Sequence, residues 1–540
     1  MPQGRVSDCP TKPALPFAWF AQNACVWSGV EFVSAPGRGV YALATQNLPR
    51  NSVVAAVPKT AVLSRKNAAA SQLLQRLLDE GLPEVEVLAL AVALERAAGR
   101  RSKWYSWLRV LADYEPLPML WSAAELRLLC GTTLDVTSRR RRQRLVENYR
   151  AIREIWAEVI SDGDGDQVIL PSLDAYLRAS TLVSSRSFHI DEQHGVALLP
   201  LGDYFNHKCA LVPDSHSVLG GGRNECGESD GDGSESARDE VNEAHDRDFE
   251  HEEGSPHSRS GSSSEGDEGA DGLALRLDLS MRVSDTSDDG PAMFITRRQL
   301  LAGEEVCLTY GELGNCELLA GYGFTLDHNP FDTVLMSSAR LADAASDAIG
   351  ERACRRRLRA LRQSHVWDDL VDRNFVFDRR ATAPTELALF LHLLIADEPL
   401  PYWTSQSGTR GQPAKALDVE RAQVVVEWSS MSPREALERA SRSASRGANG
   451  ARILQSAIRK LLQEYPRLPE LSDEKLDTQK RAQATRLVTG EIQIWESVLS
   501  WLQSEFDDKD PKRKRKLATN VLSPRLLMAA EHGAQKRRRD

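Results

Sequence analysis

Three separated segments of the 540-residue chain carry side chains that suit a reaction site. The first, residues 36–40, is a glycine-rich turn, which lets backbone approach a ligand closely and equally makes an ordinary tight turn. The second, residues 203–207, groups polar side chains directly after an apolar run, and such a group forms either a binding site or a capped loop. The third, residues 303–311, ends in Tyr310-Gly311. A tyrosine after a strand is catalytic in some proteins and core in many.

The elements around these segments predict a β-rich framework interrupted by helices. Residues 30–63 alternate and are broken by prolines, which predicts a small antiparallel meander. Residues 68–156 change to the three-and-four apolar spacing of helices, and a basic helix is expected to follow from Arg139. Strand-like sequence returns at 183–190 and 195–200. The second reactive segment therefore follows a strand.

A long acidic segment, residues 213–272, then interrupts the pattern. Residues 225–271 alone hold 17 acidic side chains and almost no β-branched or aromatic ones. Such a composition cannot bury enough apolar surface to offset the entropy of ordering, so we expect a disordered loop inserted within a domain. Strand-like sequence resumes before Tyr310, and helices are expected from 331 to about 505.

Composition excludes several classes of protein. Hydrophobic residues make up 41% and charged residues 27%, as in soluble globular proteins, and the length suggests two or three domains. No apolar run approaches the ~18 residues that span a bilayer, and the first 20 residues lack the order of a secretory signal. The eight cysteines form no C-x-x-C pair, so neither a zinc site nor a disulfide framework is expected. The net charge of −9 is set by the acidic segment.

The three segments together resemble the SET domain, in the branch similar to the Rubisco large-subunit methyltransferase. The resemblance rests on the G-x-G turn with VYALATQNLP, on the SRSF run at 185–188, on D-x-x-N-H at 203–207, and on GEEVCLTYG with its N-x-x-L-L-x-x-Y-G-F sequel. It covers roughly residues 17–505, more weakly in the C-terminal part. Histone-type SET enzymes commonly continue into a cysteine-rich zinc segment, whereas helices follow here, as in the Rubisco-methyltransferase-like branch.

This resemblance implies an S-adenosylmethionine-dependent methyltransferase acting on a lysine side chain of a non-histone protein, with no metal. By family role, Tyr310 is the expected catalytic residue. The expected cofactor-binding residues are Gly37, Arg38, Gly39, Arg186, Asn206, His207 and Tyr310. The expected substrate-binding residues are Arg186, Phe188, Asp203 and Phe324.

The implied roles agree with the chemistry of methyl transfer. A neutral amine attacks a carbon activated by a sulfonium, a displacement that depends on positioning and electrostatics. A lysine with a reference pKa near 10.4 needs a narrow, largely apolar channel that disfavours the ammonium. Aromatic walls suit such a channel. The hydroxyl of Tyr310, with a reference pKa near 10, is a poor resting base, so positioning is the expected role.

The expected fold class is α+β. A SET domain would span 17–330, with a helical insertion at 68–180 and the acidic insertion at 213–272. An all-α substrate-binding domain at 331–506 and a basic disordered tail at 507–540 would follow. The tail holds KRKRK and KRRR runs, which suit nuclear import or an acidic partner and equally a solvated tail.

Two other functions remain open on the sequence. One is histidine methylation by the same fold, although Phe188 stands where a polar amide is typical of that group. The other is a non-catalytic scaffold. The expected partner is a protein, such as a basic ribosomal or nuclear one, that the acidic insertion attracts. The insertion is equally a tolerated expansion. We expect a monomer in the nucleus or cytoplasm, without direct binding to nucleic acid or membrane.

Overall fold

The computed structural model describes residues 15–35, 39–161, 169–208, 277–284, 290–363, 367–381, 383–396, 424–442, 448–467 and 476–506. The acidic insertion, the basic tail, Gly37 and Arg38 lie outside these residues. The described chain forms two compact units. The first unit comprises the described residues of Met1–Thr333 and Tyr465–Gly490. The second unit comprises the described residues of Val334–Glu464 and Glu491–Asp540. Each unit is described by itself.

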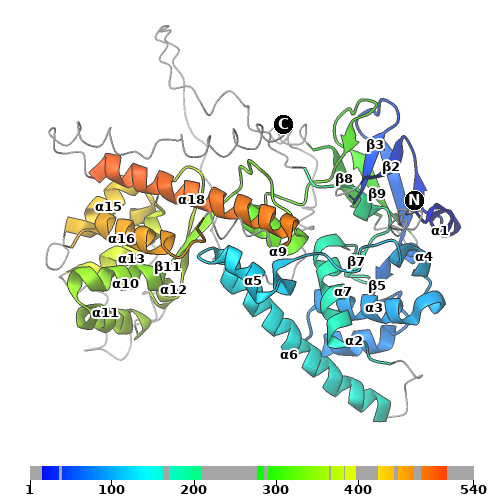
Figure 1. The fold of residues 1–540 in the computed structure, drawn as a ribbon, viewed down its shortest axis with the longest axis horizontal. Helices are drawn as coiled ribbons and strands as arrows, with labels where there is room; N and C mark the ends of the chain where they lie inside the picture. The colour runs from blue at the N-terminus through cyan, green and yellow to red at the C-terminus, as the bar shows by residue number, and fades with distance from the viewer. Residues whose placement is uncertain are drawn as a thin grey trace, which may run out of the picture. The chain divides into compact units, whose positions relative to one another are not determined.

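The first unit contains three small antiparallel sheets (Figure 1). The strands of the four-stranded sheet, in spatial order, are β1 (Val26–Trp27), β4 (Val53–Pro58), β9 (Pro291–Thr296) and β8 (Leu279–Val283). One three-stranded sheet has the order β10 (Glu305–Val306), β3 (Gly39–Ala44) and β2 (Val30–Ala35). The other has the order β5 (Leu63–Ser64), β7 (Val196–Leu198) and β6 (Ser187–His189). Side chains of β9 alternate between buried and half-buried, as expected of a strand with one face on the core.

The predicted meander over 30–63 is correct only for its first two strands. β2 and β3 pair along their whole length, and Gly39 begins β3 at a φ of +76°, a conformation that glycine adopts without a Cβ clash. β4 pairs instead with β9, and β5 with β7. These partners lie far along the chain, so local alternation could not reveal them.

The part of the chain predicted as a helical insertion, residues 68–180, contains mainly helices. After α1 (Phe17–Gln22) and the first strands, its helices are α2 (Ser71–Asp79), α3 (Glu84–Ala98), α4 (Tyr105–Leu108), α5 (Ala123–Leu126), α6 (Thr133–Ser161) and α7 (Leu173–Arg186). α3 packs against α7, and the side chains of residues 86–95 on α3 are all buried. A helix apolar on every side belongs in a core. The strand predicted over 183–190 is wrong up to Arg186, where α7 ends, and only 187–189 pair as β6.

The remaining elements of the first unit are η5 (Gly202–Tyr204), α9 (Asn315–Tyr322) and the first part of α18 (Thr478–Phe506). Lys480 and Glu125 form an ion pair of 2.9 Å, and the Gln483 side chain accepts hydrogen bonds of 2.6 Å from the amide and hydroxyl of Thr325. These contacts explain why residues 465–490 pack with the first unit.

The second unit is mainly helical. Its helices are α10 (Ser338–Ile349), α11 (Glu351–Gln363), α12 (Asp368–Val371), α13 (Thr385–Ile395), α15 (Pro433–Arg442), α16 (Gly450–Leu462) and the rest of α18. α10 packs on α11, α13 and α16 around a leucine-rich core. An antiparallel strand pair, β11 (Val334–Ser337) with β12 (Asn374–Phe377), interrupts the expected all-helical sequence. The predicted α+β fold class is confirmed. Among the described residues, no helix is long and apolar enough to cross a membrane.

Candidate active site

The candidate site begins where two distant segments of the first unit lie side by side. The amide of Leu308 donates to the carbonyl of Asn206, and the amide of Lys208 donates to the carbonyl of Leu308, each over 2.9 Å. His207 and Leu308 thereby form a parallel bridge. Two residues further on, the amide of Tyr310 donates a 2.9 Å hydrogen bond to Nδ1 of His207. The two predicted motifs therefore meet directly.

Tyr310 lies in an aromatic cluster. Its ring centroid is 4.6 Å from that of Tyr322 and 4.9 Å from that of His207, and Phe324 lies 6.0 Å from His207. The Tyr310 hydroxyl donates to the carbonyl of Phe205 over 3.2 Å. Burial raises the pKa of this hydroxyl well above its ordinary value, although the charge of Arg186 opposes the rise. Tyr310 therefore stays protonated and acts as a hydrogen-bond donor.

Asn206 contributes mainly to the crossing, the place where residues 206–208 pair with Leu308. Its side-chain amide donates to Oε1 of Glu305 over 2.9 Å, and its carbonyl accepts from Leu308. Glu305 is in β10, which pairs with β3 of the glycine-turn hairpin. Asn206 thus links the second motif to the sheet that carries the first.

Arg186 is the last residue of α7 and is held by groups from two segments. Its Nε and Nη2 donate to Oε1 of Glu115 over 3.0 and 2.6 Å, and its Nη1 donates to the carbonyl of Asp203 over 3.2 Å. Glu115 follows α4 in the helical insertion, and its amide donates to the hydroxyl of Thr181 on α7 over 2.9 Å. The Arg186 side chain is 24% exposed, so it stays accessible while these hydrogen bonds hold it in place.

Asp203 is a buried carboxylate whose oxygens accept no hydrogen bond of ordinary geometry from the described residues, although the indole of Trp107 lies near enough to lower its pKa. Its side chain is 1% exposed, and its nearest cation is Nη1 of Arg186, 3.9 Å from Oδ2. Burial raises the pKa of Asp203 to about 6, against the opposing charge of Arg186. Buried polar atoms normally have partners, so this carboxylate is suited to a ligand cation. The carboxylates of Asp203 and Glu115 both face the guanidinium of Arg186, so these three side chains together carry a net negative charge.

The turn that carries Asp203 is strained and tightly packed. Leu201, fully buried, has a φ of +65°, which is rare for a residue with a branched side chain. A Cβ on Gly202 would lie 2.9 Å from the Phe294 ring and 3.2 Å from the Phe188 ring. Strained backbone persists where surrounding packing holds it, often at functional sites. Here the packing fixes the direction of the Asp203 side chain.

The structure brings most of the predicted site residues together. Arg186, Asp203, Asn206, His207, Tyr310 and Phe324 share one network of contacts. Phe188 is 7% exposed, and its ring meets that of Phe294 edge-on at 6.1 Å beneath η5. Gly39 pairs with Ala35 next to the turn of its hairpin, and β3 passes against η5. Gly37 and Arg38 cannot be placed because they lie outside the described residues.

Sequence reasoning assigned no role to Glu115, Glu305 or Tyr322. Tyr322 belongs to the N-x-x-L-L-x-x-Y-G-F motif, so the sequence could have indicated that it lies near Tyr310. Glu115 is 71 residues from Arg186 in a helical insertion and belongs to none of the motifs, so nothing local could reveal the pair. Among the described residues, no group of His, Cys, Asp and Glu side chains is arranged to hold a metal.

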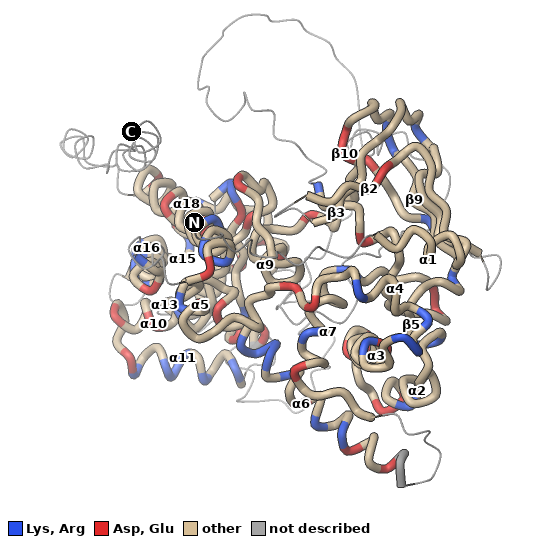
Figure 2. Tube along the Cα trace, turned by 45° about the vertical axis from the view of Figure 1, so that its right-hand side comes forward, with Lys and Arg blue, Asp and Glu red and all other residues tan. Residues whose placement is uncertain are grey.

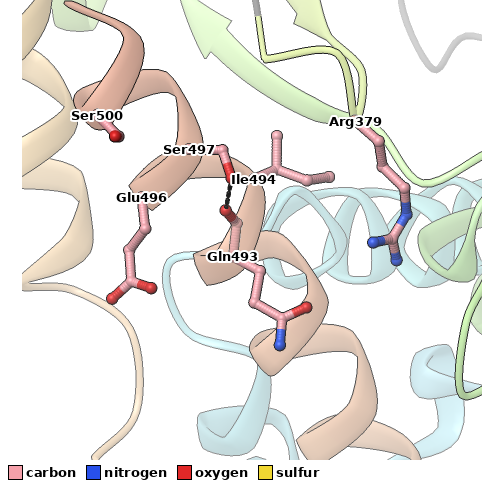
Figure 3. A pocket seen from close by; sticks show the side chains of 6 residues that line it. All are labelled: Arg379, Gln493, Ile494, Glu496, Ser497 and Ser500. Atoms are coloured by element: carbon pink, nitrogen blue, oxygen red, sulfur yellow. Dashed lines mark hydrogen bonds between the residues drawn. The ribbon is translucent and has the colours of Figure 1, made fainter. Parts of the chain in front are cut away.

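A separate hollow lies within the second unit (Figure 3). Arg379 faces α18 there, where the hydroxyl of Ser497 donates to the carbonyl of Gln493 over 2.8 Å. Its lining residues are Arg379, Gln493, Ile494, Glu496, Ser497 and Ser500. None of the predicted site residues is among them, so this hollow is not the candidate active site.

Similar proteins agree with the fold and the motifs. Ribosomal lysine N-methyltransferase 3 of Saccharomyces cerevisiae is 26% identical over 336 residues, 56% of this chain and 59% of that protein. Protein SET DOMAIN GROUP 40 of Arabidopsis thaliana is 25% identical over 315 residues, 57% of this chain and 53% of that protein. The chain thus spans little more than half the length of these curated relatives. No protein-family model matches it.

Solved structures of Rubisco LSMT have the same fold. The SET domain of LSMT bound to lysine and AdoHcy aligns with a TM-score of 0.57 and 16% identity, over 96% of this chain and 99% of that chain. Rubisco LSMT bound to AdoMet aligns with a TM-score of 0.54 and 16% identity, over 96% of this chain and 99% of that chain. The chain therefore has the SET fold of these structures, which agrees with the resemblance read from its motifs.

Proposed function

We propose that this chain is an S-adenosylmethionine-dependent methyltransferase that modifies a lysine side chain of a non-histone protein. The observation that carries the proposal is the direct contact between Tyr310 and His207 beside Arg186 and Asp203, in a SET fold. A scaffold that had lost activity would have no need for a buried carboxylate at this place.

The residues of the cluster suit the cofactor. The accessible guanidinium of Arg186 can pair with a carboxylate such as that of the methionine moiety. The excess negative charge of Glu115 and Asp203 suits a ligand that carries net positive charge, as a sulfonium with an amino acid group does. When bound, S-adenosylmethionine supplies a methyl group activated by its sulfonium.

The chain's own residues would position the amine among aromatic rings. The protonated Tyr310 hydroxyl orients the acceptor nitrogen and does not take its proton. The rings of Tyr310, Tyr322 and Phe324 form an aromatic group that suits the lysine stem and a methylammonium product. The Asp203 carboxylate attracts the arriving cationic side chain.

A ribosomal protein is the substrate class we favour. The relative from Saccharomyces cerevisiae is named a ribosomal lysine N-methyltransferase. Ribosomal proteins are rich in lysine, and the acidic segment of residues 225–271 would attract such a substrate. A nuclear or cytoplasmic location and a monomeric state fit this proposal.

The test is incubation of wild type and Tyr310→Phe with labelled cofactor and a ribosomal fraction, followed by mapping of labelled peptides. We expect label on lysine, and a loss on the order of 10²-fold in the rate for the variant, the typical contribution of one positioned group. Calorimetry must find that both proteins bind the cofactor. Label on histidine would establish the alternative acceptor, and absence of cofactor binding by wild type would establish a scaffold.

A further inference from the structure

Helix α11 of the second unit carries an unusual concentration of arginine. Six of its thirteen residues are arginine, one is acidic, and none is lysine. Figure 2 shows the basic positions along this helix. The exposed arginines are Arg352, Arg355, Arg356, Arg359 and Arg362.

The opposite side of α11 anchors the helix. Cys354, Arg357 and Leu361 are buried, and the helix packs against α10 and α13. The exposed side is therefore fixed in direction by a folded core. Every fully exposed residue on it is polar, and the side chains of Arg355 and Arg362 are 71% and 62% exposed.

The charges of this surface are only partly balanced. Arg355 pairs with Glu351 over 3.3 Å, and Arg362 pairs with Asp372 over 3.0 Å. Arg352, Arg356 and Arg359 have no ion pair or hydrogen bond with any described residue. They stand four and three residues apart, so they form one stripe, and like charges at these spacings repel and destabilise a helix. A bound polyanion would relieve that repulsion.

We propose that the exposed arginine stripe of α11 (Arg352, Arg356 and Arg359) binds the phosphate backbone of RNA. A protein partner needs a buried apolar or aromatic centre in its interface, and the exposed side of α11 offers none. Phosphate contacts need only cations, and the arginine fork matches phosphate oxygens. Without exposed aromatic residues to stack on bases, the contact is independent of base sequence.

The choice of RNA over other polyanions rests on the proposed function, since a ribosomal substrate is embedded in RNA. The binding itself does not depend on methyl transfer. It departs from the expectation of no direct contact with nucleic acid. The net charge of −9 does not argue against it, because the acidic segment 225–271 sets that charge.

The test is fluorescence anisotropy of a labelled 20-base-pair RNA duplex with the full chain, without cofactor, from 50 to 200 mM salt. The variant Arg352→Glu/Arg356→Glu/Arg359→Glu is expected to bind at least tenfold more weakly at 100 mM salt. The slope of log K against log salt should become shallower by about 2.7, for three lost phosphate contacts. Methylation of an isolated ribosomal protein should be unchanged, which separates this inference from the proposed function.

A matched control changes the same charge elsewhere. Arg140→Glu/Arg150→Glu/Arg153→Glu alters exposed arginines of α6, where Glu147 and Glu154 are interspersed. This control should retain most of the affinity for RNA. The basic runs of the tail are unchanged in both variants, so any contribution they make to binding is the same in each. Equal loss in the two variants would show that only net charge matters and would overturn the proposal. Displacement of RNA by poly-glutamate at equal charge would overturn it in favour of an acidic protein partner. Thermal unfolding must show that α11 retains its stability.

Discussion

The backbone amide of Tyr310 donates a hydrogen bond to Nδ1 of His207, and the two rings lie 4.9 Å apart. The imidazole therefore has a structural task at the crossing, whatever else it contacts. Because Nδ1 is the acceptor, the ring must carry its proton on Nε2 in the neutral form. The orientation of Tyr310 depends on this bond.

Replacing His207 by alanine should lower the stability of the first unit as well as activity. The change leaves the Tyr310 amide without its acceptor in a half-buried place, which typically costs about 1–3 kcal/mol. Urea unfolding measures the loss. His328→Ala removes an exposed histidine and should change stability by less than about 0.5 kcal/mol. Equal stability of the two variants would contradict the structural task of His207.

Replacing Asp203 by asparagine should stabilise the protein at pH 8 and impair its function. The pKa of Asp203 rises from 3.8 to about 6 on folding, so the folded state binds its proton more tightly than the unfolded state does. The ionised carboxylate therefore destabilises the fold by up to about 3 kcal/mol above pH 6, and this cost disappears as the pH falls below 4. Unfolding at pH 4 and pH 8 should show a gain for the variant only at pH 8. A gain of the same size at both values would rule out ionisation as its cause.

Replacing Glu115 by glutamine should weaken binding of the cofactor. The variant keeps the size of the side chain but loses the ion pair that orients Arg186, and it removes negative charge from the cluster. We expect about a tenfold loss of affinity for S-adenosylmethionine by calorimetry, equivalent to about 1.4 kcal/mol. The neutral product, S-adenosylhomocysteine, should lose less, because only the orientation of Arg186 affects it. Glu312→Gln, an exposed change of equal charge, should bind both ligands as wild type does.

Replacing Gly202 by alanine should disturb the turn that carries Asp203. The added methyl group would meet the Phe294 and Phe188 rings at 2.9 and 3.2 Å, and overpacking of this kind typically costs about 1–3 kcal/mol. Differential scanning calorimetry is expected to find a lower Tm. In α9, a Cβ on Gly321 would have Oγ of Ser184 as its nearest neighbour, at 4.0 Å. Gly321→Ala should therefore leave the Tm equal or higher, because alanine favours helix. A Tm at or above wild type for Gly202→Ala would show that the turn has room.

The residues of the motifs were predictable because each motif keeps its polar groups beside a strand or helix end. Asn206, His207 and Tyr310 were expected in one site, and they contact one another. The helices of the insertion were predictable from apolar spacing, as α2 illustrates with its buried Leu74 and Leu77, three residues apart. These features depend on local sequence.

Features that depend on distant partners could not be predicted. Residues 183–186 were predicted as part of a strand with the residues that follow them, yet they complete α7, whose buried face packs on α3. The pairing of β4 with β9 and the ion pair of Glu115 with Arg186 join segments separated by many residues. The short strands β11 and β12 give too few residues for alternation to stand out among helices.

The crossing of residues 206–208 with Leu308 has a consequence for how this chain tolerates length changes. His207 and Tyr310 are 103 residues apart, and residues 209–276 account for about two-thirds of that separation. The entropy of closing a flexible loop grows only with the logarithm of its length, so each doubling of a loop costs only about 0.6 kcal/mol. Large insertions between these two motifs are therefore thermodynamically cheap. A shift of one residue inside either motif would separate the tyrosine from the imidazole.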